Sequence, residues 1–107
     1  MTVAVDQRTS TWQLPIDKHA YVWIEDRSVK RVVRARLLSI SSGGAVVRTY
    51  SLFPLDVTLH VGLEGSPEAG WIEAKAIRLE RSRKVAITFM APCPPEFILA
   101  ATEEITS

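Results

Sequence analysis

The strongest sequence evidence for the fold of this chain lies in residues 33–49, VRARLLSISSGGAVVRT. Apolar and polar residues alternate from Val33 to Leu38, which is typical of a half-buried β-strand, and Ala45 to Thr49 has the β-branched composition of a partner strand. Between the two runs, Ser39-Ile40-Ser41-Ser42-Gly43-Gly44 combines small hydroxyl residues with a glycine pair. Serine and glycine favour tight turns, and glycine lets a ligand approach the backbone closely. The segment therefore predicts a β-hairpin with hydroxyl groups at its turn.

Four other segments have the composition of β-strands. The alternation is cleanest in 57–63, where the odd-numbered positions are all valine or leucine. Breaker residues separate these segments, and turn signals recur about every 8–14 residues. Together with the hairpin, the segments predict a small six-stranded antiparallel β-barrel, an all-β fold. Its expected strands are 20–25, 32–38, 45–49, 57–63, 71–79 and 85–89.

The two ends of the chain differ in character. Three prolines end the last strand, and a short helix is expected from about residue 95, because proline suits the first helical turn. Phe97, Ile98 and Ala101 give this helix an apolar face that closes one end of the barrel. Residues 1–13 are polar and lack periodicity, which predicts a flexible N-terminal arm. Residues 14–107 then form a single barrel domain with the C-terminal helix.

Composition narrows the class of protein. A length of 107 residues, 47% hydrophobic and 23% charged, fits one soluble globular domain. The net charge of +1 gives no overall attraction to a nucleic acid polymer. Cys93 is the single cysteine, so an internal disulfide and a multi-cysteine metal site are excluded. No apolar run reaches the roughly 18 residues that span a bilayer, and the N-terminus lacks a secretory pattern. We expect a cytoplasmic protein with no membrane insertion.

The hairpin and its flanks resemble the PilZ-domain family. The family motif D/N-x-S-x-x-G is matched by residues 39–44, with Ser41 and Gly44 in place and Ser39 at the Asp or Asn position. The preceding R-x-x-x-R pair of the family falls on residues 8–12, where Trp12 stands in place of the second arginine.

Two later segments extend the resemblance. Residues 86–89, Ala-Ile-Thr-Phe, are similar to the closing strand of the family, and residues 94–97, Pro-Pro-Glu-Phe, to the start of its C-terminal helix. The similarity covers roughly residues 8–101. It implies a PilZ-like barrel that acts without catalysis, as a signalling receptor or adaptor with a protein partner. Cyclic di-GMP is the regulatory ligand implied, and no other cofactor is.

The resemblance also implies a ligand site. The arginine of the family pair grips phosphate or guanine, the serines bond a guanine edge, the glycines let the base come close, and the tryptophan stacks on the base or latches the arm. Two departures from the motif each remove a charged contact, and losing one arginine weakens binding by about one to two orders of magnitude. The implied ligand-binding residues are Arg8, Trp12, Ser39, Ser41, Gly43 and Gly44.

Two other functions remain open from the sequence. The Trp12 and Ser39 departures also fit a degenerate barrel that binds a protein and no nucleotide. A small RNA-binding barrel would need a basic face with interleaved aromatic residues. Tyr21, Trp23 and Trp71 fall in strands expected to be largely buried, which disfavours this alternative.

Several cations have two interpretations each. Arg34 and Arg36 lie two residues apart and share a face of their strand, so they either bind phosphate or form cross-strand ion pairs. Arg48 is similar, and the sequence leaves open whether one of these three takes the place of the missing arginine. The cluster Arg81, Arg83 and Lys84 is either a solvated hairpin tip or a weak anion contact.

The remaining reactive side chains point to no catalytic chemistry. His19 and His60 lack neighbouring metal ligands in sequence, so a metal site is not expected. Cys93 lies between prolines and is expected to be a packed residue. Motifs of hydrolases, nucleotide triphosphatases and zinc proteases are absent from the sequence. We therefore expect no enzyme activity.

Overall fold

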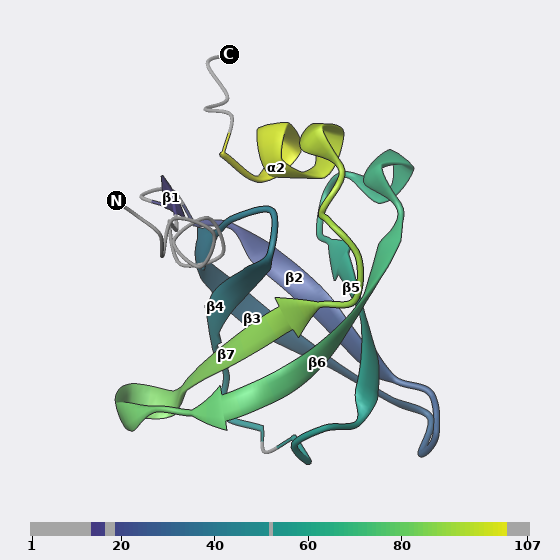
Figure 1. Ribbon diagram of the computed structural model, residues 1–107, viewed down its shortest axis with the longest axis vertical. Coiled ribbons are helices and arrows are strands. Elements are labelled where there is room, and N and C mark those ends of the chain that lie inside the picture. The colour runs from purple at the N-terminus through teal and green to yellow at the C-terminus, as the bar shows by residue number, and fades with distance from the viewer. Residues whose placement is uncertain (1–13, 17–18, 52, 103–107) are drawn as a thin grey trace, which may run out of the picture.

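The computed structural model describes residues 14–16, 19–51 and 53–102. Antiparallel strands form one sheet in the order β1-β3-β2-β5-β6-β7-β4, and pairing between β3 and β4 closes it into a barrel of six main strands (Figure 1). The predicted all-β barrel with a short C-terminal helix is confirmed. Its elements are β1 (Leu14–Pro15), β2 (Tyr21–Asp26), β3 (Arg31–Ile40), β4 (Gly44–Arg48), β5 (Thr58–Leu63), β6 (Trp71–Leu79), β7 (Lys84–Phe89) and α2 (Pro95–Thr102).

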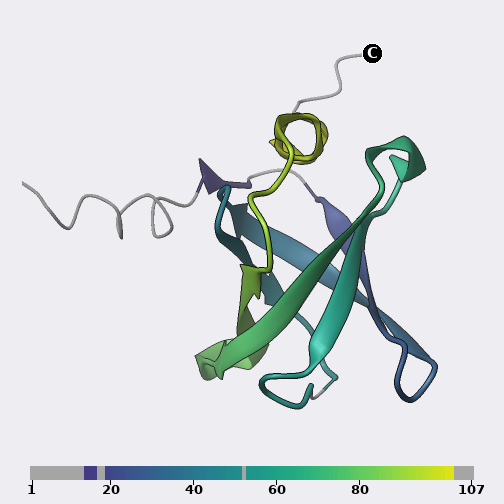
Figure 2. The same ribbon diagram turned by 45° about the vertical axis from the view of Figure 1, so that its right-hand side comes forward.

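Short single turns complete the connections. A 3₁₀ turn, Pro67–Ala69, lies between β5 and β6, and another, Arg81–Arg83, joins β6 to β7. Figure 2 shows the barrel with α2 across one end, the end at which the β3–β4 turn also lies. Within the described residues, no helix is both long and apolar enough to cross a membrane.

The longest departure from the expected strands is in β3. This strand continues through Ser39 and Ile40, which the sequence interpretation had placed in the turn. A register shift between Leu37 and Ser39 breaks the two-residue alternation. Because of this bulge, Leu37 and Ile40 both point into the core, at 1% and 0% exposure, although they lie three residues apart. The bulge also decides which face Ser39 occupies.

The core of the barrel is filled from the six main strands. The largest fully buried side chains come from four of these strands, β2 to β5, and from α2, and each is worth about 1.5–3 kcal/mol of hydrophobic stabilisation. These side chains are Val22, Ile24, Leu37, Ile40, Val47, Leu59 and Phe97.

Helix α2 closes one end of this core. It starts at Pro95, as the sequence predicted, and Glu96 lies in its first turn, where a carboxylate complements the helix dipole. Phe97 and Ala101, one helical turn apart, are 1% and 0% exposed. The expected apolar face of the helix is therefore the plug of the barrel, although Ile98 is only half-buried.

Candidate functional site

Ser41 stabilises the β3–β4 turn from within. Its side chain is only 5% exposed. Its hydroxyl accepts a hydrogen bond from the Gly43 N–H at 3.2 Å and donates one to the Gly44 carbonyl at 3.3 Å. The same carbonyl accepts the Ser41 backbone N–H at 2.8 Å. The motif serine thus has a structural role in the turn, and its contact with a guanine edge stays a prediction.

The motif glycines hold the turn against β7. The Gly43 carbonyl accepts the Phe89 N–H at 2.9 Å and the Thr88 hydroxyl at 3.3 Å. A Cβ atom on Gly44 would overlap the carbonyl oxygen of Ile87. The backbone of Gly44 is not in the left-handed region, so glycine is needed here for close approach between strands rather than for a special turn conformation.

Ser39 lies on the outer face of the barrel. It pairs with Pro15 of β1 and, beyond the bulge, with Val46 of β4. Val46 alternates with the buried Ala45 and Val47, so the pair points outward. Arg36 and Arg48, paired with each other on the same two strands, share this outer face with Ser39.

Three cations stand directly opposite one another across β3, β4 and β7. Arg36 pairs with Arg48, and Arg48 pairs with Lys84. We call these three residues the basic row. Neighbouring strands are about 4.8 Å apart, so the row spans about 10 Å. Among the ion pairs of the described residues none involves the basic row. Like charges directly opposite one another destabilise a sheet, so the basic row is electrostatically unfavourable within the described part of the chain.

Arg36 has a further unsatisfied group. Its Nε atom is buried and has no hydrogen-bond partner in the described part of the chain. A buried donor without an acceptor costs about 1–3 kcal/mol. Arg48 by contrast is exposed, and Lys84 is half-buried at the start of β7. The basic row is therefore rich in donors and lacks acceptors.

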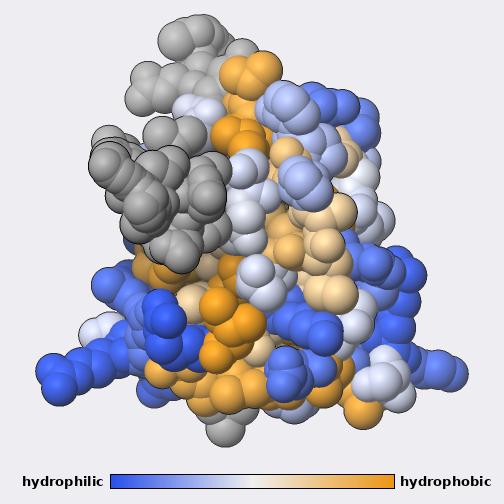
Figure 3. Space-filling view, in the orientation of Figure 1, coloured by the Kyte–Doolittle hydropathy of each residue, from blue (hydrophilic) through white to orange (hydrophobic). Residues whose placement is uncertain are grey.

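Arg34 forms an ion pair, the second of the two roles that the sequence left open for it. Its Nε donates to Glu64 at 2.9 Å, and its guanidinium lies 3.8 Å from the centroid of the Tyr21 ring. The ion-pair interpretation is thus confirmed for Arg34, whereas Arg36 and Arg48 face other cations. At the β6–β7 connection, where hydrophilic residues gather (Figure 3), Arg83 lies over the Tyr50 ring at 4.4 Å.

Arg8 and Trp12 lie outside the described residues. Their place in the site stays a prediction. The described chain begins beside the motif, because Leu14 pairs with Ile40 and Pro15 pairs with Ser39. The segment that follows Arg8 and Trp12 in sequence therefore runs along the strand end that carries the motif.

The expectation of largely buried aromatic residues is wrong. Trp23 is 36% exposed and Trp71 is 50% exposed, both on the outer face of the barrel. A closed sheet has a single interior, and here the apolar neighbours Val22, Ile24 and Ile72 fill it. The alternation of β2 already separated Trp23 from Val22 and Ile24, but sequence alone did not show that the tryptophans on the outer face remain partly exposed.

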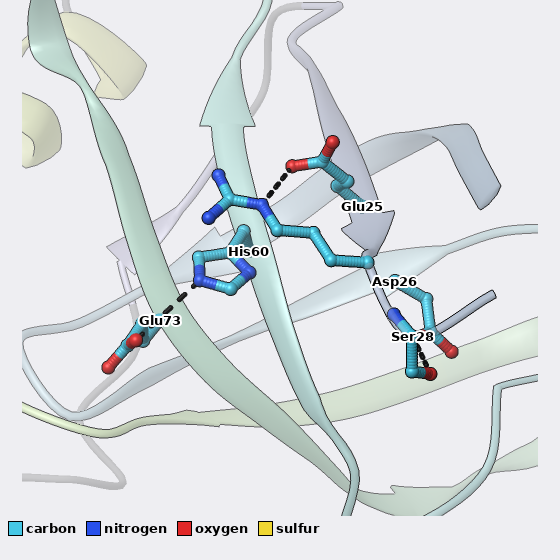
Figure 4. A network of polar contacts seen from close by, with 6 residues as sticks. Glu25, Asp26, Ser28, His60 and Glu73 are labelled. Carbon is cyan, nitrogen blue, oxygen red and sulfur yellow. Dashed lines mark hydrogen bonds and ion pairs between the residues drawn. The ribbon is translucent and has the colours of Figure 1, made fainter. Parts of the chain in front are cut away.

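His60 lies between two carboxylates that are distant in sequence. It pairs in register with Glu25 of β2 and Glu73 of β6, and its Nε2 is 3.6 Å from a Glu73 oxygen (Figure 4). Nearby, the Asp26 carboxylate accepts the Ser28 hydroxyl at 2.6 Å and fixes the β2–β3 turn. No group of side chains in the described residues has the arrangement of a metal site.

Cys93 is a packed residue, as the sequence predicted. It is 4% exposed and lies in the core cluster, and its N–H donates to the Ser42 carbonyl at 2.8 Å. Burial, with a smaller contribution from the negative charge of Glu96, raises the pKa of the thiol to about 11. The group is therefore protonated at neutral pH, which is the opposite of an activated nucleophile.

Comparison with known proteins leaves the family open. No family model matches the chain, and no curated protein matches it significantly. The resemblance to PilZ domains therefore rests on the motif of residues 39–44, the strand order and the C-terminal helix.

Proposed function

We propose that this chain is a non-catalytic, PilZ-like binding module that holds a phosphate-bearing ligand on the outer face of β3, β4 and β7. Cyclic di-GMP is the first candidate ligand. The observation that carries the proposal is the basic row, in which Arg36, Arg48 and Lys84 stand in register without an ion pair to any described carboxylate.

Phosphate suits this face chemically. A guanidinium presents a planar fork of donors that matches two phosphate oxygens, and each charge-assisted hydrogen bond is worth about 1.5–3 kcal/mol. Arg36 and Arg48 would supply the cationic contact that the family takes from the position of Trp12. An anionic ligand also relieves the repulsion within the row, so part of its binding energy comes from removing an unfavourable interaction. Ser39, on the same outer face, adds a hydroxyl that donates and accepts.

The N-terminal segment supplies the second part of the proposal. Trp12 precedes Leu14 by two residues, a separation of at most about 7 Å along the chain. Stacking of an indole on a guanine base is worth about 1–3 kcal/mol. Ordering a segment costs about 1–2 kcal/mol per residue, so ligand contacts must offset that cost. Binding would then change the population of a closed arm, and a protein partner would read that change.

Calorimetric titration of the full chain tests the proposal. Cyclic di-GMP is the ligand, with cyclic di-AMP and GTP as controls for selectivity. We expect selective micromolar binding that falls by about tenfold or more in Arg48→Gln, at about 1.4 kcal/mol per decade. Arg78→Gln is the matched control, because Arg78 is exposed but already paired with Glu80 at 2.7 Å. Absence of binding, or an equal loss in both variants, would reject the basic row as the ligand site.

A degenerate barrel that binds only a protein is the second candidate function. It is supported by the use of Ser41 and Gly44 within the turn and by the absence of the motif arginine and aspartate. The double variant Trp12→Arg, Ser39→Asp restores the family motif and separates the two functions. If the restored protein gains binding of cyclic di-GMP, the arm acts as a clamp. If it binds no nucleotide either, the protein-interaction function is favoured.

A further inference from the structure

Two tryptophans flank a glycine on the outer face of β2, β5 and β6. Gly62 pairs in register with Trp23 on one side and with Trp71 on the other. These strands lie about 4.8 Å apart, so the two tryptophan Cα atoms are separated by about 10 Å. The space over the glycine is a groove of about 280 Å³, which Glu64 and Pro67 also line. We call it the tryptophan groove.

The glycine lets one indole lie flat on the sheet. A Cβ atom on Gly62 would be 3.0 Å from two ring carbons of Trp71, Cε3 and Cζ3. One face of the Trp71 ring therefore covers Gly62, and the side chain is still 50% exposed. Since Gly62 has no side chain, nothing from β5 fills the space between the two indoles. The groove thus has an aromatic floor at Trp71 and an aromatic wall at Trp23.

Carboxylates surround these rings. Glu64 lines the groove, while Glu25 and Glu73, which Figure 4 labels, stand two residues along β2 and β6 from Trp23 and Trp71 and so lie on the same outer face as the tryptophans. Two of the three carboxylates are neutralised, Glu64 by Arg34 and Glu25 by Arg27. The Glu73 side chain is 62% exposed, and one of its carboxylate oxygens lies 3.6 Å from His60 Nε2. Glu73 is thus the one carboxylate of the three that has no arginine or lysine partner in the described part of the chain.

We propose that the tryptophan groove binds an organic cation with an alkylated ammonium head. The face of an aromatic ring attracts cations, tryptophan most strongly, and nearby carboxylates add to that attraction. An alkylated head suits an apolar groove because it is less strongly hydrated than a primary ammonium group. Because Glu25 and Glu64 are paired with arginines, the preference for a cation comes from the two indole rings and from Glu73. The same outer face already holds a cation in this manner, since Arg34 lies over Tyr21 beside Glu64.

This site is independent of the proposed phosphate site. The tryptophan groove lies over β2, β5 and β6, whereas the basic row lies over β3, β4 and β7. The two ligands also have opposite charge. Failure of either proposal therefore leaves the other intact.

The test compares choline with its uncharged carbon isostere, 3,3-dimethylbutan-1-ol, on the full chain. Binding is followed by the NMR shifts of the indole N–H groups. We expect choline to shift the Trp23 and Trp71 signals in a saturable manner and the isostere to bind at least about fivefold more weakly. Trp23→Leu and Trp71→Leu should each weaken choline binding by about fivefold or more, and Glu73→Gln by about twofold. Tyr50→Leu, an exposed aromatic residue far along the chain from the groove, is the matched control and should bind choline normally.

Three outcomes would overturn the proposal. Equal binding of choline and the isostere would show that the groove binds both through apolar contacts and does not select for positive charge. Unsaturable shifts would show that no site exists, and normal choline binding in both tryptophan variants would place the site elsewhere. Thermal unfolding checks that each variant is folded. Trp71 covers Gly62, so Trp23→Leu, on the opposite wall, keeps the test valid if Trp71→Leu does not fold.

Discussion

The basic row predicts that one arginine makes the free protein less stable. Arg48 lies between Arg36 and Lys84 in the sheet register. A like-charge pair directly opposite across two strands costs about 0.2–1 kcal/mol, so two such pairs cost about 0.4–2 kcal/mol. Arg48 is exposed and solvent screens its charge, which favours the lower half of that range. We therefore expect Arg48→Gln to raise the free energy of unfolding by about 0.4–1 kcal/mol, or the melting temperature by about 2–8 °C.

Urea unfolding at two salt concentrations measures this effect. The screening length is about 30 Å at 0.01 M salt and about 3 Å at 1 M, while the neighbouring strands are about 4.8 Å apart. The gain in stability of Arg48→Gln should therefore be largest at low salt and nearly vanish at high salt. The control Arg78→Gln loses a similar side-chain stem but breaks the ion pair with Glu80, so it should be neutral or slightly destabilising.

Comparison of these variants tests whether repulsion within the basic row destabilises the protein. If Arg48→Gln is no more stable than the parent at low salt, repulsion within the basic row is not significant. If the gain in the free energy of unfolding is the same at both salt concentrations, or the same in Arg78→Gln, the gain does not come from removing a like charge. In either case the physical basis for a phosphate site on this face would be lost.

Three further predictions concern the barrel itself. Gly44→Ala should destabilise the fold by about 1–3 kcal/mol or more, measured by urea unfolding, because the added methyl overlaps the Ile87 carbonyl; an unchanged midpoint would contradict the strand contact. Phe97→Ala should cost about 3–5 kcal/mol, because it empties the plug of the barrel, and a loss under 1 kcal/mol in calorimetry would show that α2 is dispensable. Burial raises the pKa of the Cys93 thiol from 9.0 to about 11, so the folded state holds its proton longer than the unfolded state does. The stability difference between the parent and Cys93→Ala should therefore be constant below about pH 9 and shift against the parent as pH rises to about 11; a flat difference across that window would refute the assignment.

Much of the candidate site lay beyond sequence reasoning. The sequence placed Arg34 and Arg36 on one face but gave no means of telling which of them meets a carboxylate. Both arginines pair with β2, but Arg34 also reaches Glu64 at the end of β5, whereas Arg36 stands opposite Arg48 of β4. A signal for the basic row was present only as separate cations, because Lys84 comes 36 residues after Arg48. Arg8 and Trp12 lie outside the described residues, and their roles remain predictions.

The motif of residues 39–44 was also predicted only in part from the sequence. Serine and glycine at 39–44 predicted a turn, and a turn is present between β3 and β4. Their detailed roles depend on β7, since Gly44 is packed against Ile87 and Gly43 bonds to Phe89. The bulge after Leu37 then places Ser39 on the outer face, a displacement that strict alternation does not predict.

The sequence by itself determined the six main strands, their approximate bounds, the antiparallel hairpins and the start of the helix at Pro95, but not the short strand β1. These follow from local causes: two-residue alternation, β-branched composition, and breaker residues that end each element. The tertiary structure alone decided which side chains stand opposite one another, as in the basic row and the tryptophan groove. Pairing across a closed barrel depends on register and on the bulge, and these are set by the packing of the whole core rather than by any single segment.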